Sequence, residues 1–138
     1  MGRRTPIAAL AMTPLNGLTL LVFDDDPDTV AVLAEYLESA GARVIGVSSA
    51  KAALDVTRTV HVDAVLIELH MPAEGGRWFL RQFRTPAEYG SPSVPVFAMT
   101  WERHDRPGPE SGFVGSFVKP VDVDMVIAII AALPRAVR

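Results

Sequence analysis

The chain has no cysteine among its 138 residues. Disulfide bonds, thiolate nucleophiles and cysteine-based zinc sites are therefore excluded, and a reducing, cytoplasmic location is expected. The three histidines, His61, His70 and His104, lack the spacing of a metal site. Basic residues are not in excess either, because 13 Lys and Arg stand against 16 Asp and Glu. Direct binding to nucleic acid is therefore not expected.

Long apolar segments are also missing. The run nearest the amino terminus, Ile7–Met12, has six residues. A signal-peptide core needs about 7–15 apolar residues and a membrane-spanning helix about 20, so no membrane association is expected. Turn-forming residues, Pro6, Pro14 and the Asn16-Gly17 pair, punctuate the amino-terminal stretch. We expect residues 1–16 to form a flexible arm; the alternative is that Leu10 and Met12 pack on a partner.

What the sequence does contain is a regular alternation of strand-like and helix-like segments. Short apolar runs end in polar residues, and turn-forming residues separate them. The expected strands are Leu18–Phe23, Arg43–Val47, Ala64–Ile67, Val94–Met99 and Gly115–Val118. Apolar residues at helical spacing follow, and they predict helices capped by Asp26, by Ser48 or Ser49, and by Asp122.

This alternation predicts one domain, residues 17–134, with a short tail at 135–138. Strands joined through helices imply parallel pairing, because parallel neighbours need long crossovers. We expect a five-stranded parallel sheet in a three-layer αβα sandwich. The fourth crossover is the exception, since Pro107, Gly108 and Pro109 allow only a short helix or none.

Polar residues stand at four strand ends, which share one edge of a parallel sheet. They are Asp24 and Asp25 after the first strand, Glu68 after the third, Thr100 after the fourth and Lys119 after the fifth. Carboxylates suit a hard cation such as Mg²⁺, while a lysine and a hydroxyl suit the oxygens of a phosphoryl-like anion. The pattern indicates phosphoryl handling.

Over residues 18–133 the chain resembles the receiver domain of two-component response regulators. The matching stretches are LLVFDDDPD at 20–28, DAVLIELHMPAEGG at 63–76, PVFAMT at 95–100 and FVKPVD at 117–122. The resemblance implies a flavodoxin-like (βα)5 fold and a role in phosphorelay signalling. It also implies a signalling partner such as a histidine kinase, a phosphotransfer protein or another regulator, and no enzymatic output of its own.

The resemblance further implies a Mg²⁺ site. The metal would be held by Asp24, Asp25 and Glu68, helped by the backbone carbonyl of His70. The alternative is that Lys119 pairs directly with Glu68 and neutralises the site without a metal, since buried carboxylates need compensation.

The other implied contacts to a phosphoryl group are the Thr100 hydroxyl and the Lys119 ammonium, and the Lys119-Pro120 bond would be cis. Two neighbours depart from the family. Trp101 stands where a small residue is usual and hinders access, and Ser116 replaces an aromatic residue that couples the switch in many relatives. The signalling face therefore looks rebuilt.

The main departure is Glu68, which stands where the family has its phosphate-accepting aspartate. The extra methylene moves the carboxylate by about 1.5 Å and misaligns it for attack on phosphorus. Glu68 carries one charge against about −1.5 to −2 for a phosphate, so it would be a partial, permanent mimic. Two interpretations follow: a phosphorylation-independent module that acts through protein contacts, or a receiver that still catalyses Mg²⁺-dependent phosphotransfer from a histidine kinase.

The last predicted helix, Val123–Leu133, is apolar on more than one face. Burial beneath residues 1–16 is one explanation and a homodimer interface is the other, which we prefer. With no fused output domain expected, the signal would leave through protein contacts around this helix and the fourth crossover.

Overall fold

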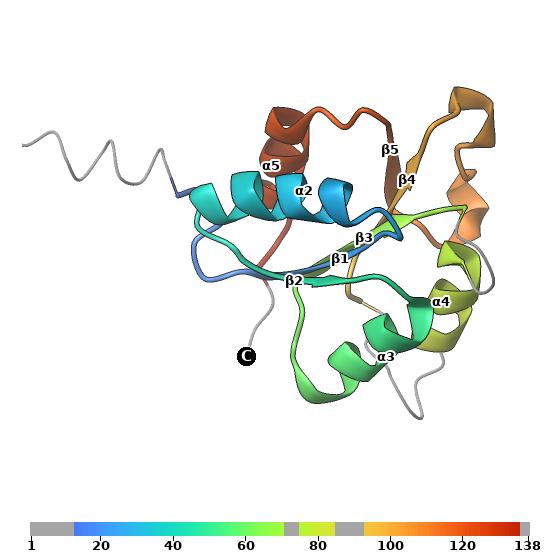
Figure 1. Ribbon diagram of the computed structural model, residues 1–138, viewed down its shortest axis with the longest axis horizontal. Coiled ribbons are helices and arrows are strands. Elements are labelled where there is room, and N and C mark those ends of the chain that lie inside the picture. The colour runs from blue at the N-terminus through green and yellow to red at the C-terminus, as the bar shows by residue number, and fades with distance from the viewer. Residues whose placement is uncertain (1–12, 71–74, 85–92, 136–138) are drawn as a thin grey trace, which may run out of the picture.

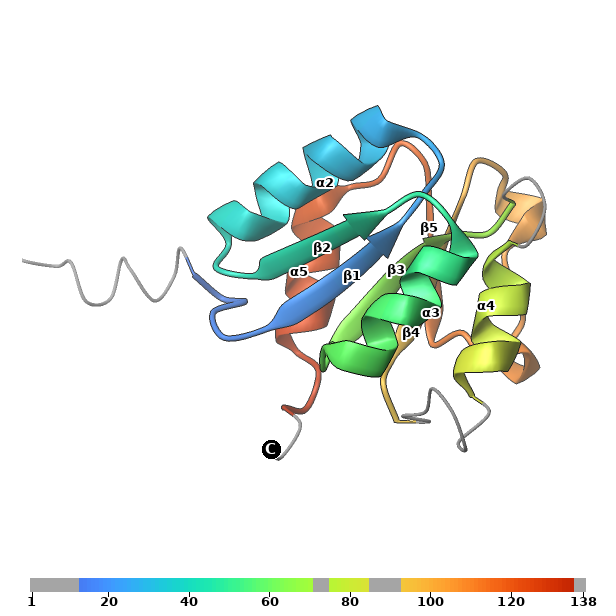
Figure 2. The ribbon, with the colours of Figure 1, turned by 60° about the horizontal axis from the view of Figure 1, so that its bottom comes forward.

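Five parallel strands form one sheet in the order β2-β1-β3-β4-β5. The computed structural model describes residues 13–70, 75–84 and 93–135 (Figure 1). The strands are β1 (Thr19–Phe23), β2 (Arg43–Val47), β3 (Ala64–Glu68), β4 (Val96–Thr100) and β5 (Gly115–Val118). Helices α2 (Pro27–Ser39) and α5 (Val123–Ala131) cover one face, and α3 (Ala50–Thr59) and α4 (Gly76–Phe83) cover the other (Figure 2). The predicted three-layer αβα sandwich is confirmed.

The strand register brings the polar strand ends to one edge. Phe23 of β1 lies beside Ile67 of β3, so the residues that follow both of them are adjacent. On the other side, Glu68 pairs with Met99, and Thr100 of β4 pairs with Val118 of β5. The edge beyond the carboxyl ends is where open α/β sheets bind ligands.

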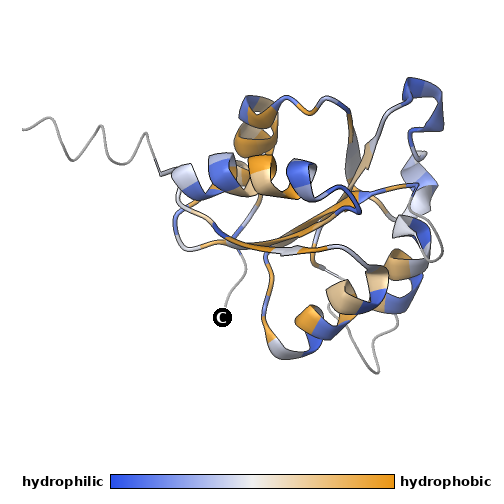
Figure 3. Cartoon of the chain, viewed as in Figure 1, coloured by the Kyte–Doolittle hydropathy of each residue, from blue (hydrophilic) through white to orange (hydrophobic). Residues whose placement is uncertain are grey.

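Two clusters of buried apolar side chains hold the helices on the sheet. In the hydropathy colouring the strands of the sheet are mainly hydrophobic, whereas the helices carry both hydrophobic and hydrophilic residues (Figure 3). The cluster between the sheet and helices α3 and α4 contains Phe23 of β1 and Phe79 and Phe83 of α4. The rings of Phe79 and Phe83 stack with centroids 5.2 Å apart. Trp78 is partly buried against the same cluster. These aromatic residues of α4 are therefore contacts of the apolar core.

Three predicted helix caps are confirmed. Asp26, Ser49 and Asp122 each accept a hydrogen bond from a backbone N–H in the first turn of the following helix, at 3.1, 3.1 and 3.2 Å. Each bond satisfies one of the amide groups that a helix start leaves without an internal partner. Ser49, and not Ser48, is the cap of α3.

The fourth crossover contains two single turns of 3₁₀ helix, Arg103–Asp105 and Pro109–Ser111, in place of an α-helix. The prolines account for this, because each removes a backbone donor and blocks a regular helix. The predicted weakness of this crossover is confirmed. None of the helices in the described ranges combines the length and apolar character needed to span a bilayer.

The residues just before β1 belong to the fold, which differs from the expected boundaries. Leu15 is fully buried, and its N–H donates to the carbonyl of Ala40 at 2.8 Å. The Arg135 guanidinium donates to the carbonyls of Asn16 and Pro14 at 3.1 and 3.2 Å. The expected arm of residues 1–16 therefore does not extend to Leu15, and the expected tail of 135–138 does not include Arg135. Residues 1–12 and 136–138, with Leu10 and Met12, lie outside the described residues.

Candidate functional site

At the carboxyl edge of the sheet, one lysine joins two buried carboxylates. The Lys119 ammonium donates to Oδ2 of Asp24 at 2.6 Å and forms a second ion pair with Oε1 of Glu68. Asp24 is fully buried, and Glu68 and Lys119 are 4% and 7% exposed. Three residues from β3 and from the loops after β1 and β5 thus form one ion-paired group, called the Lys119 triad below.

The remaining carboxylate oxygens of the Lys119 triad are also bonded. Oδ1 of Asp24 accepts from the Asp26 N–H at 2.9 Å, and Oε2 of Glu68 accepts from the His70 N–H at 3.0 Å. All four oxygens therefore have a donor, which offsets part of the cost of burying two charges.

Burial by itself would lower the pKa of the Lys119 ammonium. The hydrogen bonds and negative charges of Asp24 and Glu68 outweigh burial and raise the pKa above the ordinary 10.5. The ammonium is therefore charged at neutral pH and offsets one of the two carboxylates. The Lys119 N–H also donates to the carbonyl of Thr100 at 2.7 Å, and the Lys119-Pro120 bond is cis as predicted.

Thr100 and Trp101 close the site from the side of β4. The Thr100 side chain is fully buried, and its hydroxyl accepts from the Glu102 N–H at 3.2 Å. The Trp101 ring is 63% exposed and its centre lies 5.3 Å from the Lys119 ammonium nitrogen, within range of a cation–π interaction. The indole thus lies over the Lys119 ammonium.

Of the predicted magnesium ligands, the Asp24 and Glu68 side chains lie together, and the Lys119 ammonium bridges them. Among the residues that the structure describes, no three acidic or histidine side chains converge on one point. Asp25 is exposed, and the Lys119 ammonium binds both Asp24 and Glu68. The oxygen donors are of the kind that Mg²⁺ prefers, and in this arrangement the Lys119 ammonium occupies the place between Asp24 and Glu68.

Sequence reasoning missed one contact beside the site. The His70 imidazole lies 3.4 Å from a carboxylate oxygen of Asp105, in the first 3₁₀ turn of the fourth crossover. His70 is exposed and Asp105 is half-buried. No sequence pattern links a residue after β3 to a 3₁₀ turn after β4, because only the fold brings them together.

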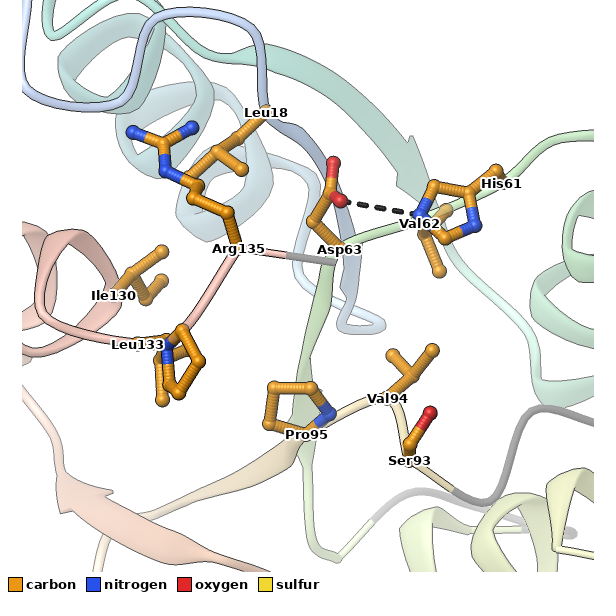
Figure 4. A pocket seen from close by; sticks show the side chains of 11 residues that line it. Leu18, His61, Val62, Asp63, Ser93, Val94, Pro95, Ile130, Leu133 and Arg135 are labelled. Atoms are coloured by element: carbon orange, nitrogen blue, oxygen red, sulfur yellow. Dashed lines mark hydrogen bonds and ion pairs between the residues drawn. The ribbon is translucent and has the colours of Figure 1, made fainter. Parts of the chain in front are cut away.

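A separate cavity of about 350 Å³ lies at the opposite edge of the sheet (Figure 4). Leu18, Val62 and Pro95, close to the starts of three strands, line it together with Leu133 from the segment after α5. Its polar pair, His61 and Asp63, has structural roles: Asp63 accepts from the His61 ring at 3.1 Å and from the Thr19 N–H at 2.8 Å. The cavity is therefore remote from the Lys119 triad.

A five-stranded parallel sheet with acids, a threonine and a lysine at its carboxyl edge defines an α/β domain whose site lies at the strand ends. The chain belongs to the response regulator receiver domain family, whose sequence model matches residues 20–131. It is therefore a receiver domain of two-component signal transduction.

Relatives support this assignment. The chain is 34% identical to the sensory/regulatory protein RpfC of Xanthomonas campestris over 86 residues, 62% of this chain and 12% of that protein. It is 31% identical over 112 residues to an uncharacterized 14.6 kDa protein of Leptolyngbya boryana, 80% of this chain and 86% of that one. Among solved structures, the receiver domain of the sensor histidine kinase PA1611 of Pseudomonas aeruginosa, described with magnesium in its active-site cleft, superposes with a TM-score of 0.72 at 24% identity, covering 83% and 94% of the two chains.

Proposed function

We propose that this receiver acts without phosphorylation at residue 68 and transmits its signal through protein contacts. The Lys119 triad carries the proposal. Both Glu68 oxygens are engaged, one by the Lys119 ammonium and the other by the His70 N–H. A carboxylate can attack phosphorus only through an oxygen that is exposed and in line. Glu68 is only 4% exposed, and its two oxygens are occupied by the Lys119 ammonium and the His70 N–H.

The same contacts give Glu68 a different use. Its longer side chain delivers a permanent negative charge to Lys119, the group that the family's pattern assigns to the phosphoryl anion. The lysine is therefore already paired without phosphate. Such a site holds one state and does not alternate between two, because its charge is fixed by the sequence.

Two neighbouring contacts support a rebuilt output. The Trp101 ring lies over Lys119, and the Ser116 hydroxyl accepts from Nε of Arg106 at 3.1 Å. Ser116 is thus hydrogen-bonded to the fourth crossover. It also lacks an aromatic ring that could move when a phosphoryl group contacts Thr100. The contact surface for partners is expected along this crossover and α5.

Magnesium has no role in the proposed function. The Lys119 ammonium supplies the positive charge between Asp24 and Glu68. The PA1611 receiver, by contrast, is described with magnesium in its cleft. Calorimetric titration with Mg²⁺ and Mn²⁺ is expected to give no saturable heat; stoichiometric binding would contradict this part of the proposal.

The test is incubation with acetyl phosphate and Mg²⁺, followed by intact-protein mass spectrometry. We expect no added phosphoryl group, because the nucleophile is buried and paired. Stoichiometric, acid-labile phosphate on Glu68 would favour the second candidate, a phosphorylation-competent receiver. The observation that favours this second candidate is the position of Asp24, Thr100 and Lys119 at the carboxyl edge of the sheet, where such chemistry would occur.

A homodimer through α5 is part of the same proposal. Val126 and Ile130 are buried on the side of α5 that packs on the core, whereas Met125 and Ile129 are 52% and 38% exposed on its outer side. An apolar outer stripe favours association. Sedimentation is expected to show a dimer that Ile129→Glu dissociates; a monomeric wild-type chain would contradict it.

A further inference from the structure

A groove lies between the first turns of α2 and the segment that leads into α5. It has a volume of about 260 Å³, and Val32 of α2 lines it together with Val121, Val123 and Trp101. Val32 and Trp101 are 50% and 63% exposed. Apolar surface that is left open beside a groove favours an interaction. This α2 groove is separate from the Met125 and Ile129 side of α5, because neither of those two residues lines it.

The open apolar surface continues from the α2 groove along the helix. Tyr36 stands four residues after Val32, which places both on the same side of α2, and it is 55% exposed. Asp28 and Glu35 stand beside them at helical spacing and are exposed. Helix α2 contains no lysine or arginine. Within the described ranges, neither Asp28 nor Glu35 forms an ion pair with a basic side chain.

The chain enters the fold at the other end of this surface. Thr13, the first described residue, lies beside Gly41, just beyond the carboxyl end of α2. A Cβ on Gly41 would come within 3.2 Å of Cβ of Thr13. Figures 1 and 2 show the described chain beginning next to this end of α2, with α5 alongside. Residues 1–12 are therefore attached at one end of α2, and the α2 groove lies at the other.

Residues 1–12 are long enough to follow the whole helix. The 13 residues of α2 extend over about 20 Å. The segment from Arg4 to Thr13 can span about 30 Å when extended. Arg4 can therefore reach the amino-terminal end of α2 from the attachment point, and a partly coiled segment can reach it as well.

The order of residue types in this segment matches the order along α2. Going back from Thr13, the apolar run Ile7–Met12 comes first, and Arg4 and Arg3 follow. Going back along α2 from the same end, the exposed apolar side chains come first and the acidic residues at the helix start follow. Residues 1–12 contain two arginines and no acidic residue, whereas α2 contains acids and no base. Charge and hydropathy are thus complementary in sequence order.

We propose that residues 1–12 dock on α2 of the same chain and close the α2 groove. Arg3 and Arg4 lie at Asp26 and Asp28, and the apolar run covers the exposed side chains of the helix. Each exposed ion pair contributes little, so docking is reversible. It is nevertheless favoured over the arm of another molecule, because the tether keeps the local concentration high. The docked arm excludes other proteins from the groove beside the Lys119 triad, whether or not residue 68 is phosphorylated.

The experiment uses the absence of cysteine from the chain. Gly2→Cys provides a single attachment point for a nitroxide spin label on the full chain. A docked arm brings the label to the amino-terminal end of α2. Amide NMR signals of Thr29, Val32 and Val121 should therefore be lost, and reduction of the label should restore them.

Two outcomes of the labelling experiment would overturn the proposal. An arm that does not dock stays close to its attachment point, so Asn16 and Gly41 would be broadened more than Val32. Docking on another molecule would broaden the signals of an unlabelled, ¹⁵N-enriched chain mixed with the spin-labelled one. The proposal requires broadening within the labelled chain, with none transferred in the mixture.

Charge reversal tests the ionic part. Arg3→Glu combined with Arg4→Glu replaces two attractions by repulsions and is expected to reduce the broadening at Val32 severalfold at about 0.1 M salt. The matched control combines Arg43→Glu and Arg77→Glu, which make the same change in net charge at exposed positions on β2 and α4. The control should leave the broadening unchanged. Equal effects of the two double variants would overturn the proposed ion pairs with Asp26 and Asp28.

Discussion

Glu68 reaches Lys119 because its side chain is one methylene longer than that of aspartate. That extra length, about 1.5 Å, lets the carboxylate contact the ammonium while its second oxygen accepts from the His70 N–H. An aspartate at the same place would draw its carboxylate back toward the backbone of β3. The charge would then be separated from Lys119, and an oxygen would become available for attack.

Replacing Glu68 by aspartate is therefore expected to create a phosphate acceptor. With acetyl phosphate and Mg²⁺, Glu68→Asp should gain one acid-labile phosphoryl group per chain, which intact-protein mass spectrometry detects. Glu68→Gln is the control and should stay unmodified, because an amide is not a nucleophile here. An inert aspartate variant would show that Trp101, which lies over Lys119, limits access instead.

Lys119 is expected to be the most costly residue of the site to remove. Lys119→Met leaves two buried carboxylates without their cation, and breaking a buried pair typically costs about 3–5 kcal/mol. Urea unfolding measures the loss. Lys51→Met is the matched control: its ion pair with Asp55 is 4.0 Å long and its side chain is 80% exposed, so a change below about 1 kcal/mol is expected.

The pH dependence of unfolding gives a second check on Lys119. Its pKa is raised in the folded chain, so its contribution to stability is complete below 10.5 and is lost as the pH rises through the higher folded value. The wild-type chain should lose stability in this alkaline range, and Lys119→Met should lack that component. Identical alkaline profiles would contradict the raised pKa.

At the scale of the elements, α3 depends on a single capping hydroxyl. Ser49 accepts from the Ala52 N–H at 3.1 Å, and the helix it starts buries Ala53 and Leu54 against the sheet. Ser49→Ala should lower the free energy of unfolding by about 0.5–2 kcal/mol, measured by urea titration. The neighbouring Ser48→Ala is the control and should cost less than about 0.5 kcal/mol. A larger loss of stability for Ser48→Ala than for Ser49→Ala would assign the cap to Ser48.

The connections before and after β4 differ in how much of the neighbouring surface they cover. Helix α4 has a regular amphipathic pattern and buries Phe79 and Phe83. The next crossover, broken by prolines, provides only two 3₁₀ turns. Because a single turn covers less surface than a helix, a groove lined by Arg77 and Ser111 remains beside α4.

At the scale of the whole molecule, the two ends of the described chain meet around Leu15. Its side chain is fully buried in the cluster under α2 and α5, and the Arg135 guanidinium binds the two carbonyls on either side of it. Leu15→Ala is expected to cost about 2–5 kcal/mol in thermal or urea unfolding, since it leaves a cavity in the core. Leu10→Ala, in the expected arm, is the control and should have a much smaller effect. Equal effects would mean that the fold begins earlier than residue 13.

Local patterns in the sequence determined most of the architecture. Apolar runs of strand length, capping residues at Asp26 and Asp122, and prolines in the fourth crossover act over a few residues, so the strands, the caps and the missing helix were predictable. The strand-end positions of Asp24, Glu68, Thr100 and Lys119 followed in the same way, because parallel strands share their carboxyl edge. These predictions needed no knowledge of long-range contacts.

Only the tertiary structure decided how those residues pair. Lys119 and Asp24 are 95 residues apart, and the sequence left open whether Lys119 or a metal would neutralise Glu68. The fold places the ammonium between the two carboxylates. Packing likewise placed Leu15 in the core and Asp105 beside His70, and it brought Val32 of α2 and Val121 to one groove. Such contacts depend on where distant segments meet, which no local pattern encodes.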